Sequence, residues 1–268
     1  MAFSSKDRQG LIIIGVSLMV ALLLAAASVA LRPDKGAWDP DTLCPVGRPL
    51  VQTVVLVDKT DPFSPSQQAY LRRSIERIRD GMKRFEKLSI FVLDANGVGA
   101  ARFALCSPGS RKEANEFYEN PAKIETRFKA TFGEPLERLL GELLQGDTAP
   151  QSPIMEAIRD VAILSDLRHS EGQRRLIIFS DLLQYTNDIS QYKPDQKMKN
   201  WQRNPTFEDF SRFSYFTEVV APLNGVEVSV VYFKRAKYHG AQTVSHIEFW
   251  QKFFNVSGGS LVEVDPIP

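Results

Sequence analysis

The stretch that decides the fold is VVLVDKTDPFS, Val54 to Ser64. Four apolar residues lead directly into Asp58 and a run of charged and turn-forming residues, which is typical of a buried strand that ends at that aspartate. Continuously apolar strands are typical of parallel sheets covered on both faces, and such sheets bind ligands outside the carboxyl ends of their strands. Asp58 is therefore predicted at the ligand-binding edge, where it could hold a metal, carry a phosphoryl group or start a turn.

Strand and helix patterns alternate along the rest of the chain. They predict an α/β fold, a Rossmann-like three-layer sandwich whose sheet is mostly parallel, with one antiparallel edge strand made by a hairpin that turns at 96–99. Ser64 and Ser152 are each expected to cap a helix, with a proline in the first turn. Strands are expected at 50–58, 88–94, 101–107, 174–181, 226–233 and 259–265, and helices at 64–88, 121–145, 152–167, 207–223 and 245–256.

The N-terminal region contains an uncharged apolar run, Leu11 to Leu31. About 20 apolar residues cross a bilayer as a helix, so residues 11–31 are predicted to be a transmembrane helix or signal anchor. A cleaved signal peptide, cut after Ala30, is an alternative. The remaining organisation is a short tail at 1–10, a tether at 32–47 and one domain at 48–268.

Composition and motifs narrow the classes of function. The formal net charge is +1, which does not give the basic footprint of a nucleic-acid-binding protein. The sequence contains no phosphate-binding P-loop, no Gly-x-Ser-x-Gly and no Cys-x-x-Cys motif, so we expect no enzymatic activity. Its two cysteines, Cys44 and Cys106, are either a disulfide in an exported domain or two unrelated buried thiols.

Three segments together resemble the von Willebrand factor A domain. DKTDP follows the first strand, SPIMEAI begins a helix, and LIIFSDL ends a strand, in the order and context of that family's metal-ion-dependent adhesion site. The resemblance implies a Mg²⁺ site that binds an acidic side chain of a partner protein. Its ligands would be Asp58, Thr60, Ser152 and Asp181, all of them oxygen donors suited to Mg²⁺. Pro62 stands where the family has a third hydroxyl ligand, so the motif is degenerate.

The resemblance also implies a sheet order of 3-2-1-4-5-6. In that order, Cys44, just before the first strand, and Cys106, at the end of the antiparallel third strand, approach each other at the edge opposite the metal site. A disulfide between them is then expected, together with an extracytoplasmic location, periplasmic or extracellular.

A long loop follows Asp181, and loops of this length are often functional or disordered. It contains aromatic and basic residues suited to a protein interface. The residues expected to contact the partner are Tyr192, Lys197, Trp201 and Arg203. The plainer interpretation is a solvated insertion packed onto the domain by Trp201.

The resulting hypothesis is a single-pass membrane protein that presents a partner-binding domain within an envelope assembly. One alternative is a structural domain with an inactive metal site that docks through residues 182–205. Another follows from DKT, which resembles the phosphorylation motif of haloacid-dehalogenase-like enzymes and would make Asp58 a nucleophile. That mechanism also needs a late Asp-Asp pair to hold Mg²⁺, and the only aspartate near the last strand is Asp265.

Overall fold

The computed structural model describes residues 5–30, 39–46, 51–114, 119–144, 148–165, 167, 172–192, 202–203 and 206–268. They belong to two compact units, Met1–Ala37 and Trp38–Pro268. The first unit contains one helix, α1 (Ser5–Ala30), over most of the segment predicted to span a membrane. Among the described residues, no helix has the length and apolarity needed to cross a bilayer. The predicted transmembrane helix over 11–31 is therefore not found, and its last residue, Leu31, lies outside the described residues.

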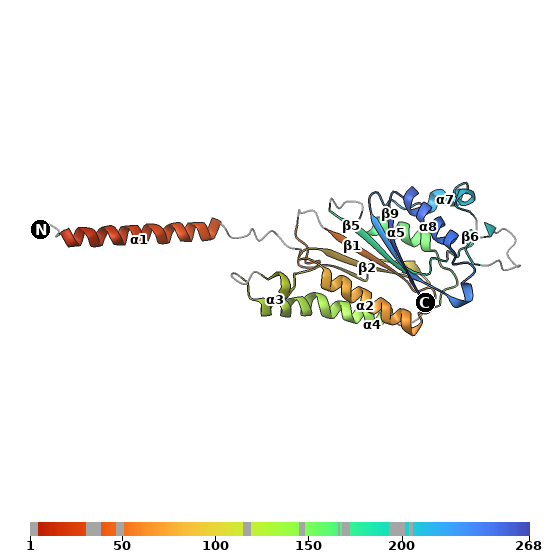
Figure 1. Ribbon diagram of the computed structural model, residues 1–268, viewed down its shortest axis with the longest axis horizontal. Helices are drawn as coiled ribbons and strands as arrows, with labels where there is room; N and C mark the ends of the chain where they lie inside the picture. The colour runs from red at the N-terminus through yellow and green to blue at the C-terminus, as the bar shows by residue number, and fades with distance from the viewer. Residues whose placement is uncertain are drawn as a thin grey trace. The chain divides into compact units, whose positions relative to one another are not determined.

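The second unit is built on a seven-stranded sheet (Figure 1). Its order is β3-β2-β1-β5-β8-β9, and β4 also pairs with β2. β3 and β4 run antiparallel to β2, whereas the other pairs are parallel. With β4 counted as the third long strand, this is the order that the resemblance implied. The strands are β1 (Gln52–Asp58), β2 (Lys87–Asp94), β3 (Gly97–Val98), β4 (Phe103–Cys106), β5 (Arg174–Ser180), β8 (Glu227–Phe233) and β9 (Ser260–Ile267).

Helices cover both faces of the sheet, as the apolar strands predicted (Figure 1). β1 is buried along its whole length. Its alternate residues Val54 and Leu56 pack in the core under α5, α7 and α8, while Val55 and Val57 pack in the core under α2 and α4. The helices are α2 (Pro65–Gly81), α3 (Pro121–Phe128), α4 (Glu134–Leu143), α5 (Ile154–Leu164), α6 (Phe207–Phe210), α7 (Ser214–Val219) and α8 (Val244–Val256).

Local sequence signals explain several helix boundaries. Ser64 caps α2 in a capping box with Gln67, and Pro65 occupies the first turn, as predicted. The helix expected at 121–145 is instead α3 and α4, joined by a π-helical segment, Lys129–Gly133. The single helix expected at 207–223 is instead two short helices, α6 and α7. The turn between them brings Phe210 against both Phe213 and Phe216, so aromatic packing replaces helical continuity.

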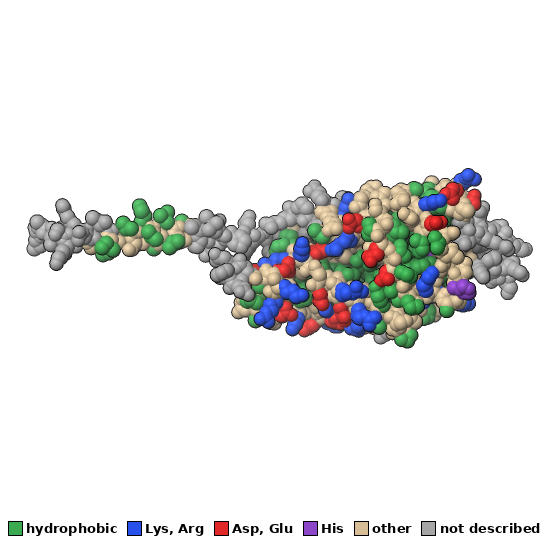
Figure 2. All heavy atoms as spheres, in the orientation of Figure 1, with side chains coloured by type: hydrophobic (Ala, Val, Ile, Leu, Met, Phe, Trp, Pro, Cys, Tyr) green, Lys and Arg blue, Asp and Glu red, His purple; other side chains and the backbone are tan. Residues whose placement is uncertain are grey.

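Opposite charges are interspersed over the face formed by α2 to α4 (Figure 2). Glu137 of α4 pairs with both Arg72 and Arg79 of α2. These pairs are partly exposed, so each contributes little to stability. This face is typical of a solvated helical layer rather than of a binding site.

A disulfide joins Cys44 to Cys106, with 4.9 Å between the Cα atoms. Cys106 is level with Lys87 of β2, which is level with Gln52 at the start of β1. The bond therefore lies at the edge of the sheet where the parallel strands begin, opposite Asp58. The predicted disulfide is confirmed.

Candidate functional site

Asp58 ends β1 and is almost fully buried, with 4% of its surface exposed. Its Oδ1 accepts hydrogen bonds from the backbone N–H of Thr60 at 3.0 Å and from the Thr60 hydroxyl at 2.6 Å. Its Oδ2 accepts one from the Ser180 hydroxyl, at the end of β5, at 2.7 Å. A buried carboxylate needs such partners, because burial without hydrogen bonds is costly. Asp58 therefore ties the ends of the two central strands together.

Ser152 joins this network, although it does not cap α5 as predicted. Its Oγ lies 2.8 Å from Thr60 Oγ1, and its backbone pairs with Tyr185. The side chain of Gln184 does the capping instead: its Oε1 accepts a hydrogen bond from Met155 N at 2.9 Å. Gln184 follows β5 and is fully buried. The Ser152 hydroxyl is thereby left to bond Thr60 rather than the helix N-terminus.

Asp181 lies beside this network and is bound by a cation from the chain itself. Arg235, after β8, donates from Nε to Asp181 Oδ2 at 2.8 Å, and only 3% of the Asp181 side chain is exposed. Asp181 Oδ1 accepts from Leu183 N at 2.9 Å. Arg235 also donates from Nη1 to the carbonyl of Pro62 at 2.6 Å. One guanidinium thus connects the residues that follow β1, β5 and β8.

Burial dominates the electrostatics of the two carboxyl groups. It raises the pKa of Asp58, against the hydrogen bonds from Thr60 and Ser180, which lower it. It also raises the pKa of Asp181, as does the charge of Asp58, while the positive charge of Arg235 opposes both. The mutual repulsion means that the two carboxylates need a positive charge nearby when both are ionised.

Leu182 turns the chain immediately after Asp181 and has a left-handed backbone, with φ of 56°. A non-glycine residue rarely adopts this conformation, so its surroundings must hold it. Its carbonyl accepts hydrogen bonds from Trp250 Nε1 at 3.0 Å and from His246 Nε2 at 3.0 Å. His246 Nε2 also lies 3.1 Å from Gln191 Oε1, so two acceptors face it, and we assign the ring proton to Nε2. Nδ1 is then left to accept from the Tyr232 hydroxyl at 2.7 Å. Burial of this ring lowers the pKa of His246 to about 4.

The structure brings the four predicted ligands together, but their oxygens already have partners. Both oxygens of Asp58 and both of Asp181 accept hydrogen bonds, and the hydroxyls of Thr60 and Ser152 bond each other. Mg²⁺ needs near-octahedral oxygen ligands and keeps several waters. As placed, with a guanidinium at Asp181 and no side-chain oxygen at Pro62, these residues do not fit a resident Mg²⁺. Binding of Mg²⁺ stays a prediction from the resemblance, and the contacts among these residues do not support it.

The loop after Asp181 folds back onto the site through Tyr192. Its hydroxyl donates to Asp61 Oδ2 at 3.2 Å. Its ring packs edge-on against Tyr185, with 5.5 Å between centroids, and against Tyr238, with 4.6 Å. Tyr192 was expected to contact a partner, and here it holds the loop to the domain. Lys197 and Trp201 lie outside the described residues, and Arg203 is described only as part of the short strand β7 (Gln202–Arg203), which pairs with β6 (Ile189–Ser190).

A groove of about 620 Å³ opens beside Arg235, between the segment after β1 and the segment after β8. Three of its lining side chains are cations, Lys234, Arg235 and Lys237, and one, Asp61, is acidic. We call it the basic groove. Its lining residues are Asp61, Pro62, Phe63, Ser64, Gln67, Lys234, Arg235, Ala236, Lys237, Tyr238 and Pro268.

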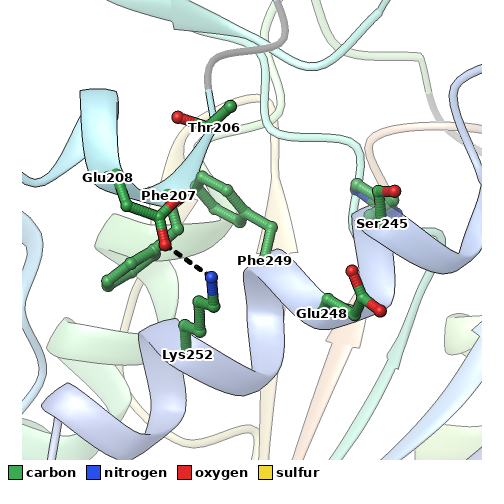
Figure 3. Close-up of a pocket in the computed structure, with 8 residues that line it drawn as sticks. Thr206, Phe207, Glu208, Ser245, Glu248, Phe249 and Lys252 are labelled. Atoms are coloured by element: carbon green, nitrogen blue, oxygen red, sulfur yellow. Dashed lines mark hydrogen bonds and ion pairs between the residues drawn. The ribbon is translucent and has the colours of Figure 1, made fainter.

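A second pocket, of about 260 Å³, lies between α6 and α8 (Figure 3). Glu208 and Lys252 point toward each other across it and form an ion pair at 2.5 Å. The rings of Phe207 and Phe249 pack edge-on, with centroids 5.6 Å apart. These contacts join α6 to α8, so we interpret this pocket as a packing feature between two helices. The candidate functional site is therefore the group of residues at the carboxyl ends of the strands.

Sequence reasoning missed Arg235, Ser180 and Gln184. The signal that could have indicated Arg235 is the basic segment KRAKYHG, residues 234–240, which directly follows the strand expected at 226–233. The pairing of Arg235 with Asp181, 54 residues earlier, depends on the loop conformation after β8. Ser180 lies directly before Asp181 in the sequence and carries a hydroxyl group. The pattern of residues along β5, however, does not predict that this hydroxyl bonds Asp58.

No family model and no curated protein matches this chain. Several solved structures are similar to it, among them the following three. An aerotolerance-related membrane protein from Bacteroides fragilis NCTC 9343 has 13% identity over 81% of this chain and 92% of that chain, with a TM-score of 0.35. The conserved hypothetical protein BatB from Bacteroides thetaiotaomicron has 15% identity over 81% and 91%, with a TM-score of 0.34. The pilus adhesin SpaC from Lactobacillus rhamnosus GG, in its open conformation, has 9% identity over 83% and 28%, with a TM-score of 0.44.

Proposed function

We propose that this chain is a non-enzymatic protein-binding domain that takes an acidic segment of a partner protein in the basic groove. The observation that carries the proposal is the lining of the groove. Arg235 is balanced there by Asp181, while the exposed side chains of Lys234 and Lys237 add two further positive charges against the one acidic lining side chain, Asp61. Like charges gathered at one groove attract a segment of opposite charge and orient it.

The shape and remaining chemistry of the groove support a peptide rather than a small anion. Phe63, Pro62 and Tyr238 supply apolar surface beside the cations. Phe63 is buried and packs edge-on against Phe233, with 5.2 Å between centroids, so this surface is fixed in place. Aromatic residues and arginine are enriched at protein interfaces. The groove also lies at the carboxyl ends of the strands, where open α/β sheets bind their ligands.

The surroundings of Asp58 favour binding over catalysis. A nucleophilic carboxylate must reach its substrate, whereas both oxygens of Asp58 accept hydrogen bonds from Thr60 and Ser180. The neighbouring Lys59 directs its ammonium to the carbonyl of Glu142, at 3.3 Å. These contacts support the role of Asp58 as a tie between strand ends.

The disulfide supports a location in an oxidising compartment, periplasmic or extracellular, because such bonds persist there and are rare in the cytosol. Placement within an envelope assembly is part of the same proposal. Attachment to a membrane through residues 11–31 stays a prediction from the sequence, because no helix among the described residues has the length and apolarity to cross a bilayer.

The proposed function is tested with fluorescence anisotropy of the full-length chain, using fluorescein-labelled hexaglutamate and hexalysine peptides. We expect hexaglutamate to bind, with an affinity that falls as salt is added, and Lys237→Glu to weaken it about tenfold or more. Lys123→Glu makes the same charge change on the exposed surface of α3 and is expected to leave the affinity unchanged. Equal binding of the two peptides, or equal loss in both variants, would contradict the proposal.

The natural partner is then sought by affinity capture with the full-length chain followed by mass spectrometry. A protein captured by the parent and by Lys123→Glu, but lost with Lys237→Glu, is the expected result. The captured protein should contain an acidic segment whose synthetic peptide competes with hexaglutamate. A partner lost equally with both variants argues for a docking surface elsewhere.

A further inference from the structure

Arg235 is held in place by contacts of both its side chain and its backbone. Its side chain is 15% exposed. Besides Asp181 and the Pro62 carbonyl, it lies 3.4 Å from Gln67 Oε1 through Nη1. Its backbone N–H donates to Gln242 Oε1 at 2.6 Å, and the amide of Gln242 in turn donates to the Asp181 carbonyl at 3.1 Å. Contacts at both ends of the residue therefore fix the guanidinium against the strand ends.

The guanidinium meets the electrostatic need of the site. Asp58, Asp61 and Asp181 all act on Arg235 through their charges. Two buried carboxylates without a cation would repel each other and lose solvation, whereas a guanidinium is always charged and is the side chain best suited to a buried ion pair. Arg235 thus supplies positive charge where the family resemblance calls for Mg²⁺.

The same arginine accounts for Pro62. A proline at that position removes a side-chain oxygen ligand, which would weaken a metal site. Its carbonyl, however, accepts a hydrogen bond from Arg235 Nη1 at 2.6 Å. A main-chain acceptor suits a guanidinium, which needs an oxygen for each of its N–H groups. The departure from the metal-binding motif and the presence of Arg235 are therefore two parts of one arrangement.

We propose that Arg235 is a built-in substitute for the divalent cation, which fixes the strand ends without metal and keeps divalent ions out of the site. Binding by the basic groove would then be independent of Mg²⁺. This inference concerns the charge balance of Asp58 and Asp181 and stands whether or not an acidic partner binds, so its failure and that of the proposed function are measured separately.

The test is isothermal titration calorimetry of the full-length chain with MgCl₂ and with MnCl₂, together with thermal unfolding in each salt. For the parent, we expect no heat of binding with either salt. We also expect its unfolding temperature in each salt to equal that in a metal-free, EDTA-treated buffer of the same ionic strength. Arg235→Ala is expected to be less stable than the parent and to gain binding of Mn²⁺ and Mg²⁺, because the space and the unpaired carboxylates then accept an ion. Lys237→Ala, which removes a neighbouring cation of the same groove, should gain no such binding.

A second variant keeps the test decisive where Arg235→Ala does not fold. Asp181→Asn added to Arg235→Ala removes the charge that needs a cation, so this double variant is expected to fold without metal and to bind no divalent ion. Divalent binding by the parent that weakens with Asp58→Asn would overturn the proposal. So would an Arg235→Ala protein that is as stable as the parent and indifferent to Mn²⁺, or a double variant that still fails to fold.

Discussion

The hydroxyls of Thr60 and Ser152 lie 2.8 Å apart, 92 residues apart in sequence, and join the end of β1 to the start of α5. Thr60 also donates to Asp58, so a single hydroxyl links the buried carboxylate to a neighbouring element. The two residues were selected from the sequence as metal ligands, and here each satisfies the other. Their bond is a structural connection whose strength is measurable.

Thr60→Val keeps the shape of the side chain and removes this connection. We expect the free energy of unfolding to fall by about 1–3 kcal/mol, because Asp58 and Ser152 each lose a buried partner. Urea denaturation measures the loss. Thr217→Val, on the exposed side of α7, is the matched control and should change stability by less than about 0.5 kcal/mol. A double-mutant cycle with Ser152→Ala then gives the coupling, and additive losses would show that the hydroxyl bond contributes nothing.

Gln184→Leu tests the capping of α5 from a distant loop. The substitution leaves Met155 N–H without its acceptor and removes the donor to Glu156 Oε2, which lies 2.9 Å from Gln184 Nε2. We expect a loss of about 2–3 kcal/mol in the free energy of unfolding, the cost of unsatisfied buried groups. Gln251→Leu, on the exposed face of α8, makes the same chemical change. If Gln184→Leu and Gln251→Leu lower the free energy of unfolding by similar amounts, Gln184 does not cap α5 in the way proposed.

His246 predicts a dependence of stability on pH. Its pKa is about 4 in the folded chain, below the unfolded value of 6.5, so the stability it contributes is complete above pH 6.5 and is lost as pH falls toward 4. The loss over that range is roughly 3 kcal/mol. Urea denaturation across this range is measured for the parent and for His246→Gln, and the difference between the two proteins isolates the effect of His246. Asp58 and Asp181 have raised pKa values, so they stabilise the folded chain as pH falls, which is the opposite of the His246 effect. Their contribution is the same in both proteins and cancels in the difference.

The control for this experiment is His239→Gln, since His239 is exposed and bonds only locally to the Ala236 carbonyl at 3.1 Å. The His246→Gln variant is expected to show a flatter decline of stability with acid, while His239→Gln follows the parent. If the parent and His246→Gln decline in parallel, the buried imidazole is not the group responsible.

The disulfide predicts the largest change in stability. In the chain-entropy model, a bond that closes a loop of 62 residues stabilises the folded state by about 4 kcal/mol. Replacing both Cys44 and Cys106 with serine should lower the free energy of unfolding by that order. Because the bond lies at the edge opposite Asp58, hexaglutamate binding should persist in whatever fraction remains folded. Dithiothreitol should destabilise the parent and leave the double variant unchanged.

The fold was predictable where the information is local or periodic. The apolar run of β1 and its charged end indicated a covered parallel strand, and Ser64 followed by Pro65 indicated the capped start of a helix. Such signals lie within one element. The family resemblance supplied the order of the sheet and, with it, the disulfide.

The site was predictable only in part, because its decisive contacts join distant segments. Ser152 looked like a helix cap, since serine before proline and a helix usually is one, but Gln184 from the next loop took that role. Arg235 could not be paired with Asp181 before the positions of two loops were known. The division of 207–223 into α6 and α7 likewise depends on where the rings of Phe210 and Phe216 find partners.

The Cys44–Cys106 bond also sets the path of mechanical force through the domain. Tension applied to the chain ahead of Cys44 would enter the sheet at β4 through a covalent bond, and residues 45–105 would carry none of it directly. β1, with Asp58 at its far end, is within that bypassed segment and would be protected from being pulled out of the sheet. Reduction of the disulfide would route the same tension into β1, so the redox state of one bond decides whether a pull on the chain is transmitted along β1 to Asp58.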